Sequence, residues 1–182
     1  MIEIKENYDI VVLGNPNLRE LSKPIKNEQF NSENLIEFGE KLLAQMYVHG
    51  GVGLAAPQIG VQVRMIAYGL KEPKPHRKDA KPIPDTILVN PTWQALTDDI
   101  TSAYEGCLSV GKIMGKVKRF HKINVKAYDV YGQKLEFEAE GLMARIIQHE
   151  TDHLDGKVFL DCMDETASLG FYEELLKINA FV

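Results

Sequence analysis

Two histidines separated by one helical turn carry the clearest chemical signal in this sequence. They stand in His149-Glu150-Thr151-Asp152-His153, inside a stretch with helical spacing. Residues four apart share one face of an α-helix, so both imidazoles can reach one metal ion. Glu150 would lie beside the open coordination position, where a carboxylate can move a proton. The pattern predicts a metal-dependent hydrolase, and the alternative is two helix histidines with ordinary structural partners.

A catalytic metal site needs a third protein ligand and an open position for water. The candidates are Cys107, Cys162, His49, His76, His121 or a carboxylate. Cys107 follows a glycine, which would let the chain come close to an ion. Cys162 is more typical of a small buried residue. In a cytosolic chain of this size, a disulfide between the two cysteines is not expected.

Apolar spacing predicts three helices that would position these residues. The first runs from about Ser32 to Tyr47 and ends before two glycines. The second runs from Leu142 to about Leu154 and carries the two histidines. The third covers Ser168 to Asn179.

Alternating apolar residues predict the strands. One covers Val61 to Tyr68 and a short one covers Ile87 to Asn90. Residues 121–129 and 135–139 form a β-hairpin around Tyr131-Gly132, and prolines among charges make Lys71 to Asp85 a surface loop. The predicted fold class is α+β, with mostly antiparallel strands packed around a central helix carrying H-E-x-x-H, an N-terminal helix and a C-terminal helix. The length of 182 residues suits one domain, so residues 1–182 are expected to form a single catalytic domain.

Charge and hydropathy narrow the class of partner. The formal net charge is -5 and no long basic run occurs, which gives DNA binding little electrostatic support. The densest basic stretch is predicted to be a solvated face or loop; it comprises Lys112, Lys116, Lys118, Arg119 and Lys122. The sequence has neither an apolar run of membrane-spanning length nor the apolar centre of a signal peptide at its N-terminus, so a cytoplasmic protein without membrane contact is expected.

Three stretches together resemble the peptide deformylase family. They are Gly51-Val52-Gly53-Leu54-Ala55-Ala56-Pro57-Gln58, Glu105-Gly106-Cys107-Leu108-Ser109, and Gln148-His149-Glu150-Thr151-Asp152-His153-Leu154-Asp155-Gly156. Their order and approximate spacing are similar to the family's, from the N-terminal helix to about Leu160. The combination is far more specific than H-E-x-x-H alone.

The resemblance implies a role for each matched residue. Cys107, His149 and His153 would bind the metal, natively Fe²⁺, with Zn²⁺, Ni²⁺ or Co²⁺ able to replace it. Glu150 would act as general base and then general acid. The Gln58 side-chain amide and the Leu108 backbone N–H would hold the oxyanion, where such donors can contribute about 3–4 kcal/mol.

The resemblance also implies the substrate and its pocket. The substrate would be the N-formylmethionyl end of a new polypeptide, met near the ribosome, and formate would be released. Gly53 would contact the substrate backbone and Glu105 would shape the site. The methionine side chain would lie against Val52, Ala103, Leu142, Ile146 and the ring of His149, with Arg145 at the rim. Their apolar bulk suits a flexible thioether.

The sequence departs from the family pattern beside the cysteine motif. After Val110 the family usually has a proline, and a few residues later an arginine. Here Gly111 and Met114 occupy these positions. The departure concerns the loop next to the site and therefore peptide affinity.

Two other functions compete with this interpretation. One is another metallohydrolase, such as a small zinc protease. The other is a non-catalytic, metal-stabilised module that binds nascent peptides or ribosomes. A binding module needs neither Glu150 nor Gln58, and only a deformylase would release formate from a formyl-Met peptide.

Overall fold

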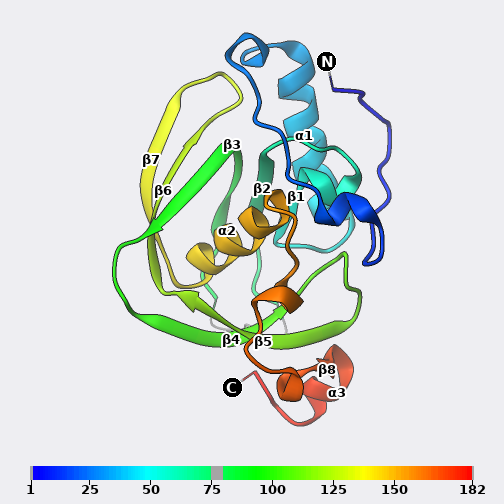
Figure 1. Ribbon diagram of the computed structural model, residues 1–182, viewed down its shortest axis with the longest axis vertical. Coiled ribbons are helices and arrows are strands. Elements are labelled where there is room, and N and C mark those ends of the chain that lie inside the picture. Colours follow the sequence, from blue (N-terminus) through cyan, green and yellow to red (C-terminus); the bar gives the residue numbers. More distant parts are fainter. Residues whose placement is uncertain (1, 75–79, 182) are drawn as a thin grey trace.

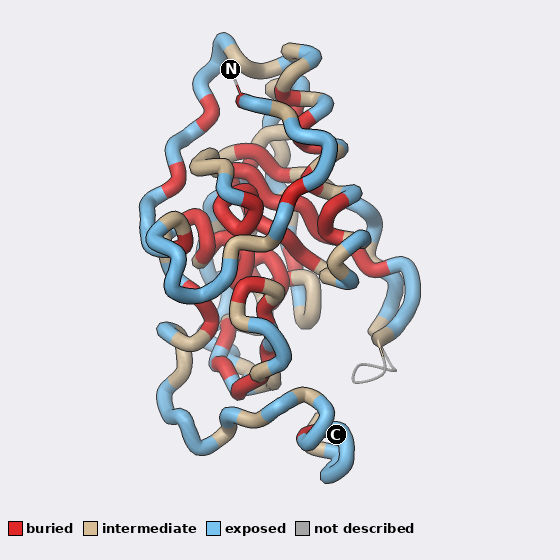
Figure 2. Tube along the Cα trace, turned by 90° about the vertical axis from the view of Figure 1, so that its right-hand side faces the viewer, coloured by how far each residue is buried: buried red, intermediate tan, exposed pale blue. Residues whose placement is uncertain are grey.

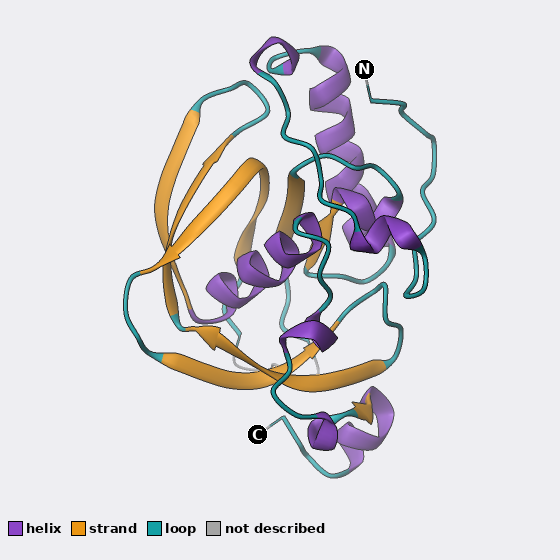
Figure 3. Cartoon of the chain, viewed as in Figure 1, coloured by secondary structure: helices purple, strands orange, loops and turns teal. Residues whose placement is uncertain are grey.

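Two antiparallel sheets and three α-helices make up the part of the chain that this computed structural model describes, residues 2–74 and 80–181 (Figure 1). Figure 3 shows the larger sheet curving along one side and the smaller one crossing below it. Short 3-10 turns join the elements at Pro16–Arg19, Asn27–Gln29, Ala56–Ile59, Phe159–Cys162 and Thr166–Ser168. None of the helices within these residues has the length and apolarity needed to cross a bilayer.

Helix α1, Glu33–Val48, covers one edge of the larger sheet. The Ser32 hydroxyl accepts a hydrogen bond from the Leu35 N–H and so caps the first turn. Its apolar stripe, which includes Phe38 and Leu42, is buried and contacts β1, β2 and β3. The chain leaves the helix through Gly50, whose φ of 72° suits glycine. The predicted helix at 32–47 is confirmed to within one residue.

The larger sheet has the strand order β1-β2-β3-β6-β7. Its strands are β1 Gly53–Ala55, β2 Met65–Leu70, β3 Ile83–Ala95, β6 Lys122–Tyr128 and β7 Lys134–Glu140. The predicted hairpin is confirmed, because β6 and β7 pair antiparallel across the turn at residues 129–133.

The smaller sheet has the order β4-β5-β8. Its strands are β4 Ile100–Gly106, β5 Ile113–Phe120 and β8 Gly170–Phe171. Strand β8 runs directly into helix α3, Tyr172–Lys177. The last helix is therefore shorter than the predicted span of residues 168–179, because the chain first pairs with β5 at residues 170–171.

Helix α2, Gly141–Leu154, lies between the two sheets (Figures 1 and 3). It contacts β1, β2, β3 and β7 on one side and β5 on the other. Every residue from 144 to 151 is buried, and eight consecutive residues cover all faces of a helix. Figure 2 shows that burial is concentrated in the middle of the molecule, whereas the C-terminal end of the chain is mostly exposed.

Two strand predictions were wrong in extent. Strand β2 begins at Met65, four residues later than predicted, and is buried along its whole length. Strand β3 continues through Pro91, where a short strand was predicted to stop. The ladder shifts register between Val89 and Thr92, and Asn90 adopts a φ of 51° there. A proline is tolerated at such an irregularity because the missing N–H is not needed.

The basic stretch was also misread at one position. Its residues lie mainly on β5, where Lys116 and Lys118 are exposed but Arg119 is only 6% exposed. In the region predicted to be the surface loop, Ile83 already begins β3, and residues 75–79 lie outside the described residues.

Candidate metal centre and active site

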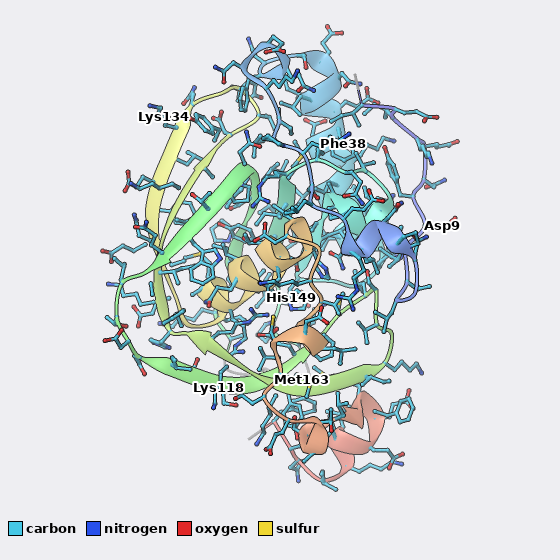
Figure 4. The ribbon with its side chains drawn as sticks, viewed as in Figure 1. Asp9, Phe38, Lys118, Lys134, His149 and Met163 are labelled. Carbon is cyan, nitrogen blue, oxygen red and sulfur yellow. The ribbon has the colours of Figure 1, made fainter. Side chains whose placement is uncertain are left out.

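Cys107, His149 and His153 come together in the interior. Their ligand atoms all lie within 4.8 Å of one another, and all three residues are buried. Cys107 follows the last residue of β4, and both histidines lie on α2, with ring centroids 5.1 Å apart. Cys107 Sγ lies 3.3 Å from His153 Nε2. Figure 4 places His149 at the centre of the molecule.

These donors suit a first-row divalent metal ion, because a thiolate and two imidazoles are common ligands of such ions. Glu150 supports the same assignment. Its Oε2 is buried and has no hydrogen-bond partner among the described residues. Burial raises the pKa of Glu150 to about 7, which is suitable for a group that must accept and release protons near neutral pH.

Gly53 explains how the Glu150 carboxyl fits beside β1. A Cβ at position 53 would lie 2.2 Å from Glu150 Oε1, so only glycine leaves this space free. Gly53 was predicted to contact the substrate backbone. The structure adds that it makes room for the carboxyl group of α2.

Gln58 is held with its amide nitrogen toward the cysteine. The Ala55 N–H donates to Gln58 Oε1 at 2.8 Å, which fixes the oxygen end of the amide. The Nε2 end then lies 3.4 Å from Cys107 Sγ and 3.2 Å from Ser109 Oγ. A buried N–H donor thus points at the cluster of ligand atoms.

Glu105 lies behind the three candidate ligands and contacts three other side chains, those of His149, Arg145 and Arg119. Its Oε2 lies 2.9 Å from His149 Nδ1, and its Oε1 accepts from Arg145 Nη1 at 2.7 Å. Arg119 adds a bidentate pair through Nε and Nη2, both at 3.0 Å. Burial alone would raise the pKa of Glu105, but hydrogen bonds and positive charge from His149 and Arg119 outweigh it and hold that pKa well below its usual range. Glu105 therefore fixes the orientation of the His149 ring.

Arg119 and Asp152 belong to this network, and the sequence analysis missed both. Arg119 Nη1 binds Asp152 Oδ2 at 2.6 Å, so one guanidinium bridges β4 and α2. The sequence signal that could have identified Arg119 is the two-residue alternation of a strand, which places residue 119 on the same face of β5 as residues 115 and 117. All three residues are buried. A basic residue on the inward face of a strand requires a buried acidic partner.

The remaining ligand candidates lie elsewhere. Cys162 is partly buried, and its thiol donates to Asp152 at 3.3 Å. His49 Nε2 lies 3.2 Å from the Tyr8 carbonyl oxygen, and His121 Nε2 lies 3.1 Å from Glu140 Oε1. His76 lies outside the described residues.

A cavity of about 520 Å³ opens onto the cluster. Its lining includes these residues of the predicted site: Val52, Gly53, Gln58, Glu105, Cys107, Leu108, Leu142, Arg145, Ile146, His149 and Glu150. Two placements differ from the prediction. Ala103 is not among the lining residues. Arg145 is 5% exposed, so it is a buried partner of Glu105 instead of a residue at an open rim.

Gly111 and Met114, where the sequence departs from the family pattern, both line this cavity. Gly111 has a φ of 81°, which a proline ring cannot adopt. Met114 pairs with Gly106 across β4 and β5, and its side chain lies over that glycine. An apolar thioether therefore forms this part of the wall.

The Cys-His-His donor set, with the Glu150 carboxyl beside it at a cavity, fits a metal-dependent hydrolase. A family model described as polypeptide deformylase matches residues 7–168. Peptide deformylase 1 of Prochlorococcus marinus is 41% identical over 92% of this chain and 86% of that protein, and peptide deformylase 1 of Bordetella pertussis is 37% identical over 92% and 94%. The chain belongs to the peptide deformylase family.

Solved structures agree with this assignment. A class I type b peptide deformylase from Acinetobacter baumannii with Met-Ala-Ser bound has a TM-score of 0.82 and 31% identity, and the match covers 86% of this chain and 98% of that one. A plant peptide deformylase has a TM-score of 0.79 and 28% identity, over 99% of this chain and 91% of that one.

Replacing the two cysteines separately tests the ligand set. A three-ligand site is expected to hold about one metal ion per chain. Cys107→Ser should reduce the metal content of the purified protein far below that value. Cys162→Ser is the matched control and should keep its metal, because its thiol binds Asp152. Elemental analysis of both variants measures this. Loss of metal from Cys162→Ser with retention in Cys107→Ser would reverse the assignment.

Two neighbouring residues on β5 test the buried network. Arg119→Met removes a guanidinium from two carboxylates and should lower the free energy of unfolding by about 3 kcal/mol, since Arg145 still binds Glu105. Lys118→Met breaks only an exposed pair with Asp164 and should leave the free energy of unfolding nearly unchanged. Urea unfolding of both variants gives the comparison, and equal losses would contradict a structural role for the network.

Proposed function

We propose that this chain removes the formyl group from the N-terminal formylmethionine of new polypeptides and releases formate. The observation that carries the proposal is the convergence of Cys107, His149 and His153 beside Glu150 at one cavity, in a member of the peptide deformylase family. The partner is the N-formylmethionyl nascent chain, met in the cytoplasm near the ribosome. The relative solved with Met-Ala-Ser bound supports a peptide ligand.

Cys107, His149 and His153 are the proposed metal ligands, and α2 is the central helix that presents two of them. A bound divalent metal would supply a Lewis acid and lower the pKa of a water molecule toward neutrality. We propose Fe²⁺ as the natural ion, with Zn²⁺, Ni²⁺ or Co²⁺ able to replace it. A thiolate beside Fe²⁺ is an oxidisable pair, so the natural ion is best identified by metal analysis after anaerobic purification.

Glu150 is the proposed proton carrier. It would take a proton from the attacking water and deliver it to the leaving amine. Its raised pKa suits both steps, and Gly53 leaves the space in which its carboxyl group lies. Gln58 Nε2 and the Leu108 backbone N–H would donate to the carbonyl oxygen as negative charge develops there.

The proposed methionine pocket is formed by Val52, Leu142, Ile146 and the ring of His149, which all line the cavity. Glu105 acts behind it by orienting His149, and Arg145 by binding Glu105. We propose that residues 1–182 act as one catalytic domain, because residues beyond the family match also line the cavity. The buried positions of Glu150 and Gln58 favour catalysis over a non-catalytic peptide-binding role.

The direct test is formate release from matched peptides. Formyl-Met peptides should be cleaved well, formyl-Asp peptides poorly and acetyl-Met peptides scarcely at all. The acetyl methyl group would displace the carbonyl carbon from the donors, and a displacement of about 1 Å can cost on the order of 10²-fold in rate. Measured kcat/KM values decide the point. Equal values for formyl and acetyl peptides would show that the acyl site is wrongly assigned.

The proton-carrier role predicts that Glu150→Ala keeps its metal and loses the chemistry. The rate should fall by roughly 10²–10⁴-fold, since the three ligands do not include this residue. Glu140→Ala is the control, because that carboxylate is exposed and lies just before α2. Metal analysis and formate release are measured together. A Glu150→Ala protein with stoichiometric metal and near-parental activity would exclude the role.

A further inference from the structure

We propose that residues 163–181, the C-terminal segment, form one wall of a subsite for peptide residues that follow the methionine, and that Glu173 makes this wall selective for charge. The inference rests on the proposed function. The cavity that reaches Cys107 and Glu150 is also lined by Lys112, Tyr172 and Glu173. Figures 1 and 4 show this segment beyond β4 and β5, with Met163 near its start.

The C-terminal segment is held firmly along β5. Strand β8 pairs with it at Ile113 and Met114, and the Tyr172 N–H donates to the Lys112 carbonyl oxygen at 2.8 Å. Further along, the Ser168 hydroxyl accepts from the Lys116 N–H at 2.9 Å. Side chains as well as backbone therefore fix this wall relative to the active site.

Packing at Gly115 strengthens the attachment. A Cβ there would lie 2.6 Å from Met163 Cε and 3.0 Å from Leu169 Cδ2, so the segment lies directly on the β5 backbone. At the other end, the Phe181 ring lies 5.3 Å from the Tyr104 ring and 5.9 Å from the Tyr172 ring. The wall is thus part of the folded enzyme.

The charged groups of the wall can exchange partners with a ligand. Lys112 Nζ binds Glu173 Oε1 at 2.6 Å, and the two side chains are 74% and 64% exposed. Pairs with this exposure are weak, so a charged peptide side chain can compete for either partner. The adjacent Glu174 binds Lys177 instead and does not line the cavity.

The cavity has room for such a peptide. A volume of about 520 Å³ lies within the range of sites that take drug-sized ligands, which exceed a single side chain. A methionine held beside His149 would leave space for the following residues. An extended chain advances about 3.3–3.6 Å per residue, so the groups of the wall can act on the next few positions.

Charge reversal at Glu173 tests the proposal. The substrates are formyl-Met tetrapeptides with Asp or Lys at the second, third or fourth position, and the readout is the Asp-to-Lys ratio of kcat/KM at each position. Glu173→Lys should raise this ratio by about fivefold at one or more positions, the upper range for an exposed charge pair. Glu173→Gln should give a smaller shift in the same direction. Glu174→Lys, the matched control, should leave every ratio unchanged.

The ratio is internal to each variant, so a general loss of activity cancels out. Ratios that shift equally in Glu173→Lys and Glu174→Lys would show only a long-range charge effect and overturn the subsite. Ratios that stay constant in both would overturn it as well. Formyl-Met amide, which has no residue after the methionine, serves as the control for activity itself. If the parent protein releases no formate from this amide, the proposed function fails and the subsite fails with it. If it does release formate, a failure of the ratios to shift as expected overturns the subsite alone.

Discussion

The site depends on the hydrogen-bonded ion pairs of the buried Glu105 carboxylate. Glu105 stands at the end of β4, and its partners come from β5 and α2. A charge taken out of water is costly unless it is paired and hydrogen-bonded, so the position of Glu105 requires Arg119, Arg145 and His149 to remain where they are. The same contacts that satisfy one carboxylate therefore set the distance between the smaller sheet and the helix.

The position of His149 in that network determines which of its ring nitrogens can bind a metal ion. Its Nδ1 faces Glu105, so Nε2 is the nitrogen left for a metal ion. Gln148, the preceding residue, forms a matched pair of hydrogen bonds with the Phe120 backbone, at 2.8 and 3.1 Å. Helix α2 is thus attached to β5 through Gln148 and through the ion pair between Arg119 and Asp152, which restrict its rotation about its own axis. Histidines presented from such a helix keep a constant geometry.

The cavity combines parts of different rigidity. Its floor includes buried groups on α2, on β1 and at the end of β4. Its outer wall contains a glycine turn at Gly111, an apolar Met114 and exposed charges on the C-terminal segment. Buried charge networks tolerate few substitutions, whereas exposed pairs contribute little to stability and are free to vary. This division would separate the proposed chemistry, assigned to the floor, from the proposed choice of peptide, assigned to the wall.

The sequence by itself determined the elements whose signals are local. Helical spacing located α1 and α2, alternation around a turn located the β6–β7 hairpin, and the resemblance selected Cys107 over the other candidate ligands. Only the tertiary structure decided the rest. Arg119 looked like one of several surface cations because its partners, Glu105 and Asp152, are distant in sequence. The extension of β3 through Pro91 depends on an irregular ladder, and the pairing of residues 170–171 with β5 replaced part of a predicted helix. The periodicity of a sequence shows which face of a helix or strand is apolar. Which other element packs against that face depends on pairing and burial between residues far apart in the chain, and a short stretch of sequence does not contain that information.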